Sequence, residues 1–197
     1  MGKNKPLKQI FERDKIFFQN LNNTGVVTLK HYKDAGVSSS RIKAYVKAGL
    51  IEKTPKENGG DFGYKATAEG KKFAEKQWGI KRSESYVFQS LNHDKKLEEE
   101  YYNIDHSVYE WKTESQARDM FRDRIEEIRK ENYERAVKIE RMWENKEISM
   151  PDAIVIERET ERIIAIEIIT NNYGEEQLQA KETFVEVMQI DYKPVRA

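Results

Sequence analysis

The spacing of apolar residues predicts that the chain begins with helices. Apolar side chains recur at near-helical intervals between Leu7 and Leu21, and the Asn-Asn-Thr-Gly run at 22–25 is typical of a helix end. A second, short helix is predicted over 29–35, followed by Gly36 in a left-handed conformation. A tight turn then leads into a third helix.

The third helix, predicted over 40–48, has two contrasting faces. Ser38 or Ser39 fits its N-cap. Its buried stripe is expected to consist of Ile42, Tyr45 and Val46. Its outward face is small, hydroxylic and basic, and consists of Ser40, Arg41, Lys43 and Lys47. Two helices joined by a short turn, the second with such a face, are the arrangement that enters the major groove of DNA.

A hairpin and a further helix are predicted next. Residues 49–54 and 62–67 are typical of strands, and the turn-rich segment 55–61 between them is typical of a flexible tip. A helix over 68–77 follows. As an ordered set, the elements over residues 7–78 resemble the winged helix-turn-helix superfamily, in which a glycine follows the second wing strand by a few residues.

The winged-helix resemblance implies an interface with duplex DNA. Lysines on or beside the wing are expected to contact phosphates, and the third helix is expected to contact phosphates or base edges. The expected DNA-binding residues are Ser38, Ser39, Ser40, Arg41, Lys43, Lys47, Lys53, Lys56 and Lys65. Winged helices also serve as protein docking modules, which is the alternative for this half.

The second half alternates a long helical segment with strands. Residues 113–146 contain no Gly or Pro and predict one long helix, or two, with a stripe suited to core packing or a dimer seam. Strands are predicted over 150–158 and 162–170, the second nearly all apolar and therefore central in its sheet. A helix over 175–188 and a last short strand at 189–192 complete the pattern. The predicted fold class is α+β.

Charge divides the chain into two parts. The sequence has 35 basic and 35 acidic residues, yet residues 1–82 contain 18 basic and 8 acidic ones, a net charge of +10, which leaves −10 for 83–197. This asymmetry favours a polyanionic partner for the first part, most often nucleic acid. A solvated, lysine-rich surface is the alternative. We expect two domains, 1–82 and 83–197.

Composition excludes several classes of protein. The chain has no cysteine, so disulfide scaffolds, thiolate zinc sites and cysteine nucleophiles are excluded. His31, His93 and His106 have no zinc-binding spacing, and neither a phosphate-binding glycine loop nor a Gly-x-Ser-x-Gly elbow occurs. The sequence lacks a run of about 18 apolar residues and a signal-peptide core. We therefore expect a cytoplasmic protein without a membrane partner.

The candidate catalytic residues of the second half are two acids. Asp152 opens one predicted strand after a proline, and Glu167 lies late in the next strand, before a helix. This outline resembles the PD-(D/E)xK nuclease superfamily, which implies that the two carboxylates share a magnesium ion that activates water. Active members have a lysine two residues after the second acid, where this chain has Ile169.

A lysine on the following helix is the expected substitute. The resemblance implies that Lys181 reaches the same space, with Glu175 and Gln179 bordering the site. Glu114, or one of the acids at 98–100, would supply the first-helix acid. In the alternative interpretation Asp152 caps the start of a strand, Glu167 is an edge residue, and no metal binds.

The order of motifs along most of the chain resembles the replication-relaxation family. The resemblance is carried by the N-terminal winged helix, the segment around His93, the run Trp111-Lys112-Thr113-Glu114, the strand opened by Pro151-Asp152, and the strand with Ala165-Ile166-Glu167. The family occurs on plasmids, phages and integrative elements and is linked to replication and relaxosome function through DNA binding. Its strand commonly ends acid, x, Asp, Arg, Gly, Thr, and the Asp, Arg and Gly are absent here.

Together these features predict a DNA-binding protein of a mobile element, acting in replication, transfer or transcriptional control. The nuclease-like domain would be catalytically degenerate, require no cofactor, and serve assembly as a homodimer or with other proteins of a replication or transfer complex. One alternative is a magnesium-dependent endonuclease with Asp152, Glu167 and Lys181 as its site, the two acids binding the metal. Another is an adaptor or inhibitor whose acidic half binds a basic partner.

Overall fold

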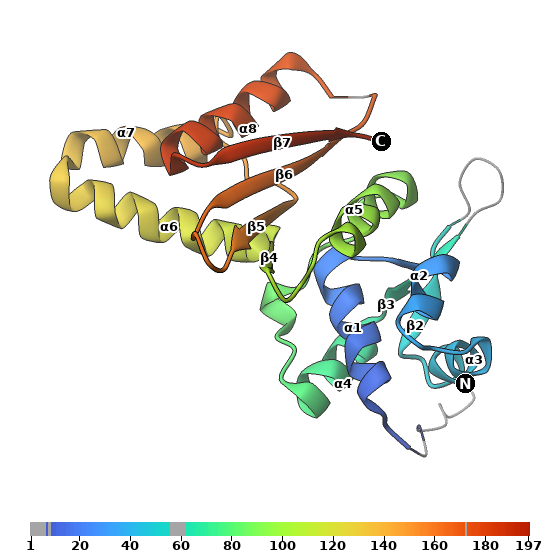
Figure 1. The fold of residues 1–197 in the computed structure, drawn as a ribbon. Helices are drawn as coiled ribbons and strands as arrows, with labels where there is room; N and C mark the ends of the chain where they lie inside the picture. Colours follow the sequence, from blue (N-terminus) through green and yellow to red (C-terminus); the bar gives the residue numbers. More distant parts are fainter. Residues whose placement is uncertain (1–6, 8, 56–61, 172) are drawn as a thin grey trace. The chain divides into compact units, whose positions relative to one another are not determined.

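The computed structural model describes residues 7, 9–55, 62–171 and 173–197 (Figure 1). The chain is a mixed α+β protein that divides into two compact units, Met1–Asn103 and Ile104–Ala197. Each unit has its own sheet. Among the described helices, none is both long and apolar enough to cross a bilayer.

The first unit surrounds a small sheet with helices (Figure 1). Its sheet has the order β1-β3-β2, and both strand pairs are antiparallel. The elements are α1 (Glu12–Thr24), β1 (Val27–Thr28), α2 (Leu29–Asp34), α3 (Ser39–Lys47), β2 (Ile51–Lys53), β3 (Gly63–Ala66), α4 (Ala68–Trp78), the 3-10 turn η1 (Arg82–Glu84) and α5 (Leu91–Asn103).

An aromatic cluster forms the core of the first unit. Phe17 and Phe18 from α1 lie against Tyr45 from α3, with ring centroids 5.1 and 5.4 Å from that of Tyr45. Ile42 and Ile51 are buried in the same cluster. The core therefore fixes which face of α3 points inward and which remains exposed.

Most local boundaries in the first unit agree with the spacing in the sequence, but the start of the first helix and the burial of Val46 differ. The first helix begins at Glu12 rather than near Leu7, because the Asp14 carboxylate accepts the backbone N–H of Phe11, 2.8 Å away, at the helix start. Val46, expected in the buried stripe, is 43% exposed. Ile42 and Tyr45 fill the inward side of α3, so Val46 is left on the solvent side.

The second unit contains a four-stranded mixed sheet of order β4-β5-β6-β7. Strands β4, β5 and β6 are antiparallel, and β7 runs parallel to β6. The elements are β4 (Tyr109–Thr113), α6 (Glu114–Glu131), α7 (Tyr133–Glu144), β5 (Ala153–Glu157), β6 (Ile163–Ile169), α8 (Glu175–Met188) and β7 (Asp191–Arg196).

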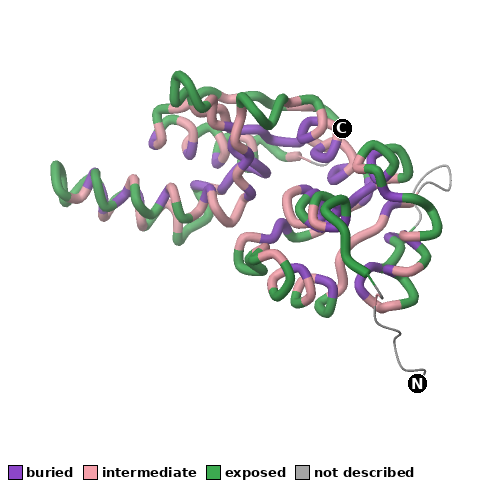
Figure 2. Tube along the Cα trace, turned by 60° about the horizontal axis from the view of Figure 1, so that its bottom comes forward, coloured by how far each residue is buried: buried purple, intermediate pink, exposed green. Residues whose placement is uncertain are grey.

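Helices α6, α7 and α8 pack their apolar faces together over one side of this sheet. Along α6 the buried residues recur turn by turn (Figure 2). Phe121 of α6 lies 5.2 Å from Phe184 of α8, measured between ring centroids, and Ile154 of β5 belongs to the same buried cluster. This side of the sheet is therefore covered by α8, the helix that carries Lys181.

Of the two possibilities predicted over 113–146, one long helix or two, the structure has two helices, α6 and α7. Asn132 has an extended backbone, with φ −150° and ψ 95°, and its side chain accepts the N–H of Arg135 at 3.0 Å. It thus ends α6 and caps α7. The break lets both helices contribute to one core, since Ile128 and Ala136 on either side are both buried in it.

The division between the units falls after Asn103, whereas the sequence placed a boundary after residue 82. The segment beyond η1 belongs to the first unit because α5 packs against α1 and β1. Tyr86 donates its N–H to the carbonyl of Asn22, 2.8 Å away, and its side chain is buried. The residues that follow the expected boundary are therefore part of the core of the first unit.

Candidate functional site

The structure brings together the three residues predicted for a nuclease-like site. Asp152 lies directly before β5, Glu167 lies in β6, and Lys181 lies in α8. Ala153 pairs with Ile166, so Asp152 and Glu167 are opposite one another on the two strands and point to the same side of the sheet. Both acids are almost completely buried, at 2% and 0% exposure.

Each of the two carboxylates binds the backbone of the other strand. The N–H of Asp152 donates to Oε2 of Glu167 at 3.1 Å, and the N–H of Ile168 donates to Oδ2 of Asp152 at 2.8 Å. This reciprocal pair satisfies two amides at the end of the strand ladder. The interpretation that Glu167 is an edge residue is wrong, because β6 lies between β5 and β7.

Lys181 supplies the positive charge of the cluster. Its Nζ lies 2.9 Å from Oε1 of Glu167 and also donates to the backbone carbonyl of Met150. Only 14% of the Lys181 side chain is exposed, so the ion pair is largely shielded from water. The hydroxyl of Tyr173 donates a further hydrogen bond to Oε1 of Glu167.

These surroundings place the pKa of Glu167 in the neutral range. Burial and the neighbouring Asp152 carboxylate raise the pKa of Glu167 to about 7, against the lowering effect of Lys181 and Tyr173. Tyr192 of β7 pairs with Ala165 in register and its pKa is raised to about 12, first by burial and then by Glu167. A carboxyl that titrates near neutral pH can accept or donate a proton under physiological conditions.

The residues expected to border this cluster make other contacts. Glu175 and Gln179 are exposed on α8 and line a separate cavity of about 580 Å³ with Met142 and Lys146. Glu114 pairs with Arg118 on its own helix at 2.7 Å. The acids at 98–100 belong to the first unit. Across the described ranges, no group of three or more potential ligands among His, Cys, Asp and Glu gathers as a metal site.

The exposed face of α3 carries most of the residues predicted to contact DNA. Ser38 caps the helix by accepting the N–H of Arg41 at 3.3 Å, and it lies 2.9 Å from the hydroxyl of Ser40. Ser39 lies 3.1 Å from the Tyr32 hydroxyl. Lys43 and Lys47 are exposed, and neither forms an ion pair within the described part of the chain.

Arg41 does not point outward with these residues. Its guanidinium pairs with Asp14, donating from Nε to Oδ1 at 3.1 Å and from Nη2 to Oδ2. Asp14 is fully buried and also accepts the Tyr45 hydroxyl. The outward Arg41 predicted from the sequence is therefore wrong in this conformation, because a buried carboxylate on α1 holds its side chain.

The hairpin supplies two of its three predicted lysines to the described surface. The Nζ of Lys53 lies 4.4 Å from the ring centroid of Phe62. Lys65 pairs with Glu52 at 3.3 Å and lies 5.0 Å from the ring centroid of Phe88. Lys56 lies outside the described residues.

The sequence patterns did not point to some residues of the carboxylate cluster or to the lysines of a cavity in the first unit. Tyr173 and Tyr192 join the carboxylate cluster from a loop and from the last strand, and neither carries a motif. In the first unit, Lys30 and Lys33 of α2 share a cavity with Lys95 of α5. Positions so far apart in the chain give no periodic signal; only the excess of lysine in this half pointed to such a surface.

No protein-family model, no curated protein and no solved structure matches the chain.

Proposed function

We propose that this protein is a cytoplasmic DNA-binding protein whose first unit is a winged helix that inserts α3 into the major groove of duplex DNA. The observation that carries the proposal is the exposed face of α3, with Ser38, Ser39 and Ser40 at its start and Lys43 and Lys47 one turn apart beyond them. Hydroxyl and ammonium groups are the donors that contact phosphates and base edges.

The geometry of α3 supports groove binding. A helix with its side chains is about 10–12 Å in diameter, which matches the major groove of about 12 Å, and α3 has nine residues with which to follow it. The inward face is fixed by Ile42 and Tyr45, which are buried. A helix held in this way presents its outer face without further ordering, which lowers the entropic cost of binding.

Net charge supports the same partner. Residues 1–103 contain 20 basic and 13 acidic residues, a net charge of +7, and residues 104–197 have a net charge of −7. A positive unit is attracted to the phosphate backbone, whereas the negative unit is repelled by it. The second unit then serves assembly, and a homodimer would place two recognition helices on one site.

The resemblance to the replication-relaxation family supports a role on a mobile element, in replication, transfer or transcriptional control. In this role the second unit would contact a second copy of the chain or other proteins of a replication or transfer complex. Sequencing DNA crosslinked to the protein in cells would identify its binding site, and an enrichment no greater than that of a non-binding control would contradict the role.

The DNA-binding proposal is tested with matched charge variants. K43Q/K47Q should weaken binding to a labelled duplex about fivefold for each phosphate that is no longer neutralised at 0.15 M salt, and should make the salt slope shallower by about 2. K130Q/K138Q removes two exposed lysines of the second unit and should bind like the wild type. Equal affinities for all three proteins would contradict the proposed role of α3.

A second candidate function is a magnesium-dependent endonuclease, favoured by the meeting of Asp152, Glu167 and Lys181. Mg²⁺ is commonly held by one or two carboxylates and water, so the residue types are suitable. Binding would have to displace hydrogen bonds that these buried carboxylates now accept from the protein. Asp152 and Glu167 would hold the ion, which when bound supplies an activated water and charge neutralisation at the phosphoryl group. Lys181 balances the charge of the two acids, and Glu167 can hold a proton near neutral pH.

A nicking assay separates the two candidates. Supercoiled plasmid is incubated with Mg²⁺ and the wild type, D152N, E167Q or K181M, and folding of each variant is checked by circular dichroism. The endonuclease predicts nicking by the wild type and loss of nicking in folded variants. Absence of nicking by the wild type would leave DNA binding as the function.

A further inference from the structure

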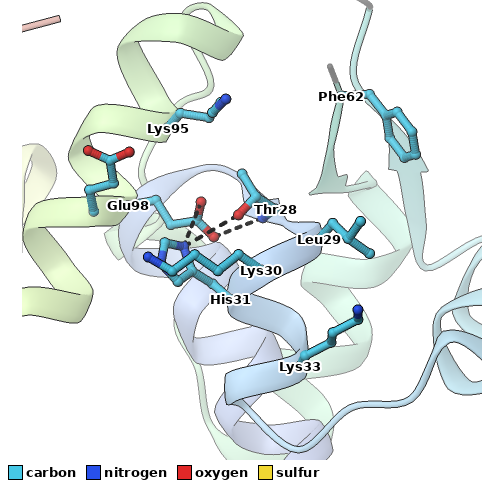
Figure 3. Close-up of a pocket in the computed structure, with 9 residues that line it drawn as sticks. Thr28, Leu29, Lys30, His31, Lys33, Phe62, Lys95 and Glu98 are labelled. Carbon is cyan, nitrogen blue, oxygen red and sulfur yellow. Dashed lines mark hydrogen bonds and ion pairs between the residues drawn. The ribbon is translucent and has the colours of Figure 1, made fainter. Parts of the chain in front are cut away.

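A cavity of about 440 Å³ opens in the first unit between α2, α5 and the residue before β3 (Figure 3). Three of its lining residues are lysines: Lys30 and Lys33 from α2 and Lys95 from α5. Phe62 lies on the hairpin side of the cavity. The remaining lining residues are Thr28, Leu29, His31, Glu98 and Glu99.

Two of the three lysines are available for an external anion. Lys30 and Lys33 are exposed, and in the described part of the chain no carboxylate lies within ion-pairing distance of either. Each ammonium is carried on a flexible four-carbon stem, so it can move over the opening of the cavity. A lysine binds phosphate as a point charge and needs no fixed planar geometry.

The two acids of the lining are already engaged by the protein. Glu98 is fully buried; its Oε1 accepts the N–H of Thr28 at 2.8 Å, and its Oε2 lies 3.0 Å from Nδ1 of His31. Glu99 pairs with Lys96 at 3.0 Å. Figure 3 shows Glu98 joined to Thr28 and His31 in the wall of the cavity. The charge that faces solvent is therefore dominated by the lysines.

The wall itself is rigidly built. The His31 ring stacks on the Tyr102 ring with centroids 4.1 Å apart, and the Tyr102 hydroxyl donates to the His31 carbonyl at 3.3 Å. These contacts tie α2 to α5, which fixes the backbone positions of the lysines on both helices. A preorganised backbone reduces the cost of ordering the side chains around a ligand.

We propose that this cavity binds a phosphate group, with Lys30, Lys33 and Lys95 as its cationic contacts. The phosphate has two possible sources: a phosphodiester of duplex DNA passing α2, or a free phosphorylated compound such as a nucleotide, whose base would stack on Phe62. The first source rests on the proposed DNA-binding function, and the second is independent of it.

The test uses the full-length chain, the variant K30Q/K33Q/K95Q, and K130Q/K138Q/K146Q as a control with the same charge change. Five of the six lysines are exposed and Lys95 is half-buried, so the variants should retain the wild-type melting temperature within a few degrees. One arm measures binding to a labelled duplex across salt concentrations. The other measures binding of inorganic pyrophosphate and of ATP by calorimetry.

The two arms distinguish the sources of phosphate. Duplex binding weakened about fivefold for each lysine that neutralises a phosphate, with a shallower salt slope and no pyrophosphate or ATP binding, supports the backbone phosphodiester. Stoichiometric pyrophosphate or ATP binding that disappears only in K30Q/K33Q/K95Q supports a free phosphate compound. Wild-type behaviour of K30Q/K33Q/K95Q in both arms would overturn the phosphate site.

The same measurements separate this proposal from the proposed function. If the wild type binds no duplex DNA, the DNA-binding function fails and the pyrophosphate and ATP arm still decides the cavity. If K43Q/K47Q binds DNA normally while K30Q/K33Q/K95Q does not, the role of α3 fails and the phosphate site stands.

Discussion

At the scale of single residues, Asp14 and Glu167 show how differently this chain uses buried acids. Asp14 is held by Arg41, Tyr45 and the backbone of Phe11, so its charge serves the packing of α1 against α3. Glu167 shares its surroundings with a second carboxylate, and its pKa is raised to about 7. Asp14 therefore stabilises the packing of two helices, whereas Glu167 is placed where it can accept or donate a proton.

Replacing Arg41 should test its structural role. R41A leaves the buried Asp14 without its cation, and we expect the free energy of unfolding to fall by about 2–4 kcal/mol. Urea denaturation followed by circular dichroism measures this change, and K43A, at an exposed position of the same helix, is the control. R41A with wild-type stability but weak DNA binding would show that Arg41 leaves Asp14 to reach DNA.

The raised pKa of Glu167 predicts a pH-dependent stability. The folded state binds this proton more tightly than the unfolded chain between pH 4.5 and about 7, so stability should fall as pH rises through this window, by up to about 3 kcal/mol. E167Q should flatten this dependence. K181M, which removes a cation that lowers the pKa, should extend the window upward.

Urea unfolding at a series of pH values from 4 to 9 measures the effect. E159Q changes an exposed acid and should retain the wild-type pH profile. An E167Q profile identical to that of the wild type would contradict the raised pKa of Glu167.

At the scale of elements, one close backbone approach positions α4 against the start of β2. Thr67 caps α4 by accepting the N–H of Gly70 at 3.0 Å, and its own N–H donates to the carbonyl of Leu50 at 3.0 Å. A Cβ on Gly70 would overlap the same carbonyl group. Gly70, which follows β3 by a few residues, is therefore required by this contact.

Substitution of Gly70 should be costly for this reason. We expect G70A to lower the free energy of unfolding by about 2 kcal/mol or more, because the backbone of Leu50 must shift to admit the methyl group. Urea denaturation measures the loss. G174A is the control, since among the described residues no atom outside its chain neighbours lies within 4 Å of the position a Cβ would take at Gly174. Equal stability of both variants would contradict the predicted clash.

Asn132 decides the boundary between α6 and α7. N132A removes the side-chain oxygen that accepts the N–H of Arg135 and should cost about 1 kcal/mol, while N132D should retain the cap. Thermal unfolding of the two variants measures the difference. If N132A were as stable as N132D, the cap would have no energetic role at this break.

Elements were easier to predict from the sequence than the contacts between them. The order of helices and strands follows from apolar spacing, and the resemblance to the PD-(D/E)xK nucleases implied the meeting of Asp152, Glu167 and Lys181. Local patterns could not show that Arg41 pairs with an acid 27 positions earlier. The position of the break, at Asn132, was equally hidden, because asparagine is tolerated within a helix and periodicity continues on both sides.

At the scale of the whole molecule, the chain consists of two units of opposite charge, each with its own core. The cavity with Lys30, Lys33 and Lys95 escaped prediction because α2 and α5 are brought together only by the fold of the first unit. The same packing makes α5 part of that unit. A boundary placed by composition alone separates the helix from its core.

Fragments provide a direct test of this boundary. Residues 1–103 should unfold cooperatively and bind DNA with the salt slope of the full-length chain. Residues 1–82 lack the buried Tyr86, Leu91 and Glu98, and should be less stable by roughly 4 kcal/mol or more. Thermal unfolding of both fragments measures this, and equal stability would contradict the assignment of α5 to the first unit.

The reciprocal hydrogen bonds of Asp152 and Glu167 also bear on how this chain would drift in evolution. Each acid accepts a hydrogen bond from a backbone amide of the neighbouring strand. A register shift of one residue between β5 and β6 would therefore break both hydrogen bonds. Selection for correct strand alignment alone would keep the two acids in a descendant that cleaves nothing. Conservation of this pair of acids in diverged homologues would therefore be evidence for a role in folding. Conservation of Lys181 and Tyr173 as well would be needed as evidence for catalysis.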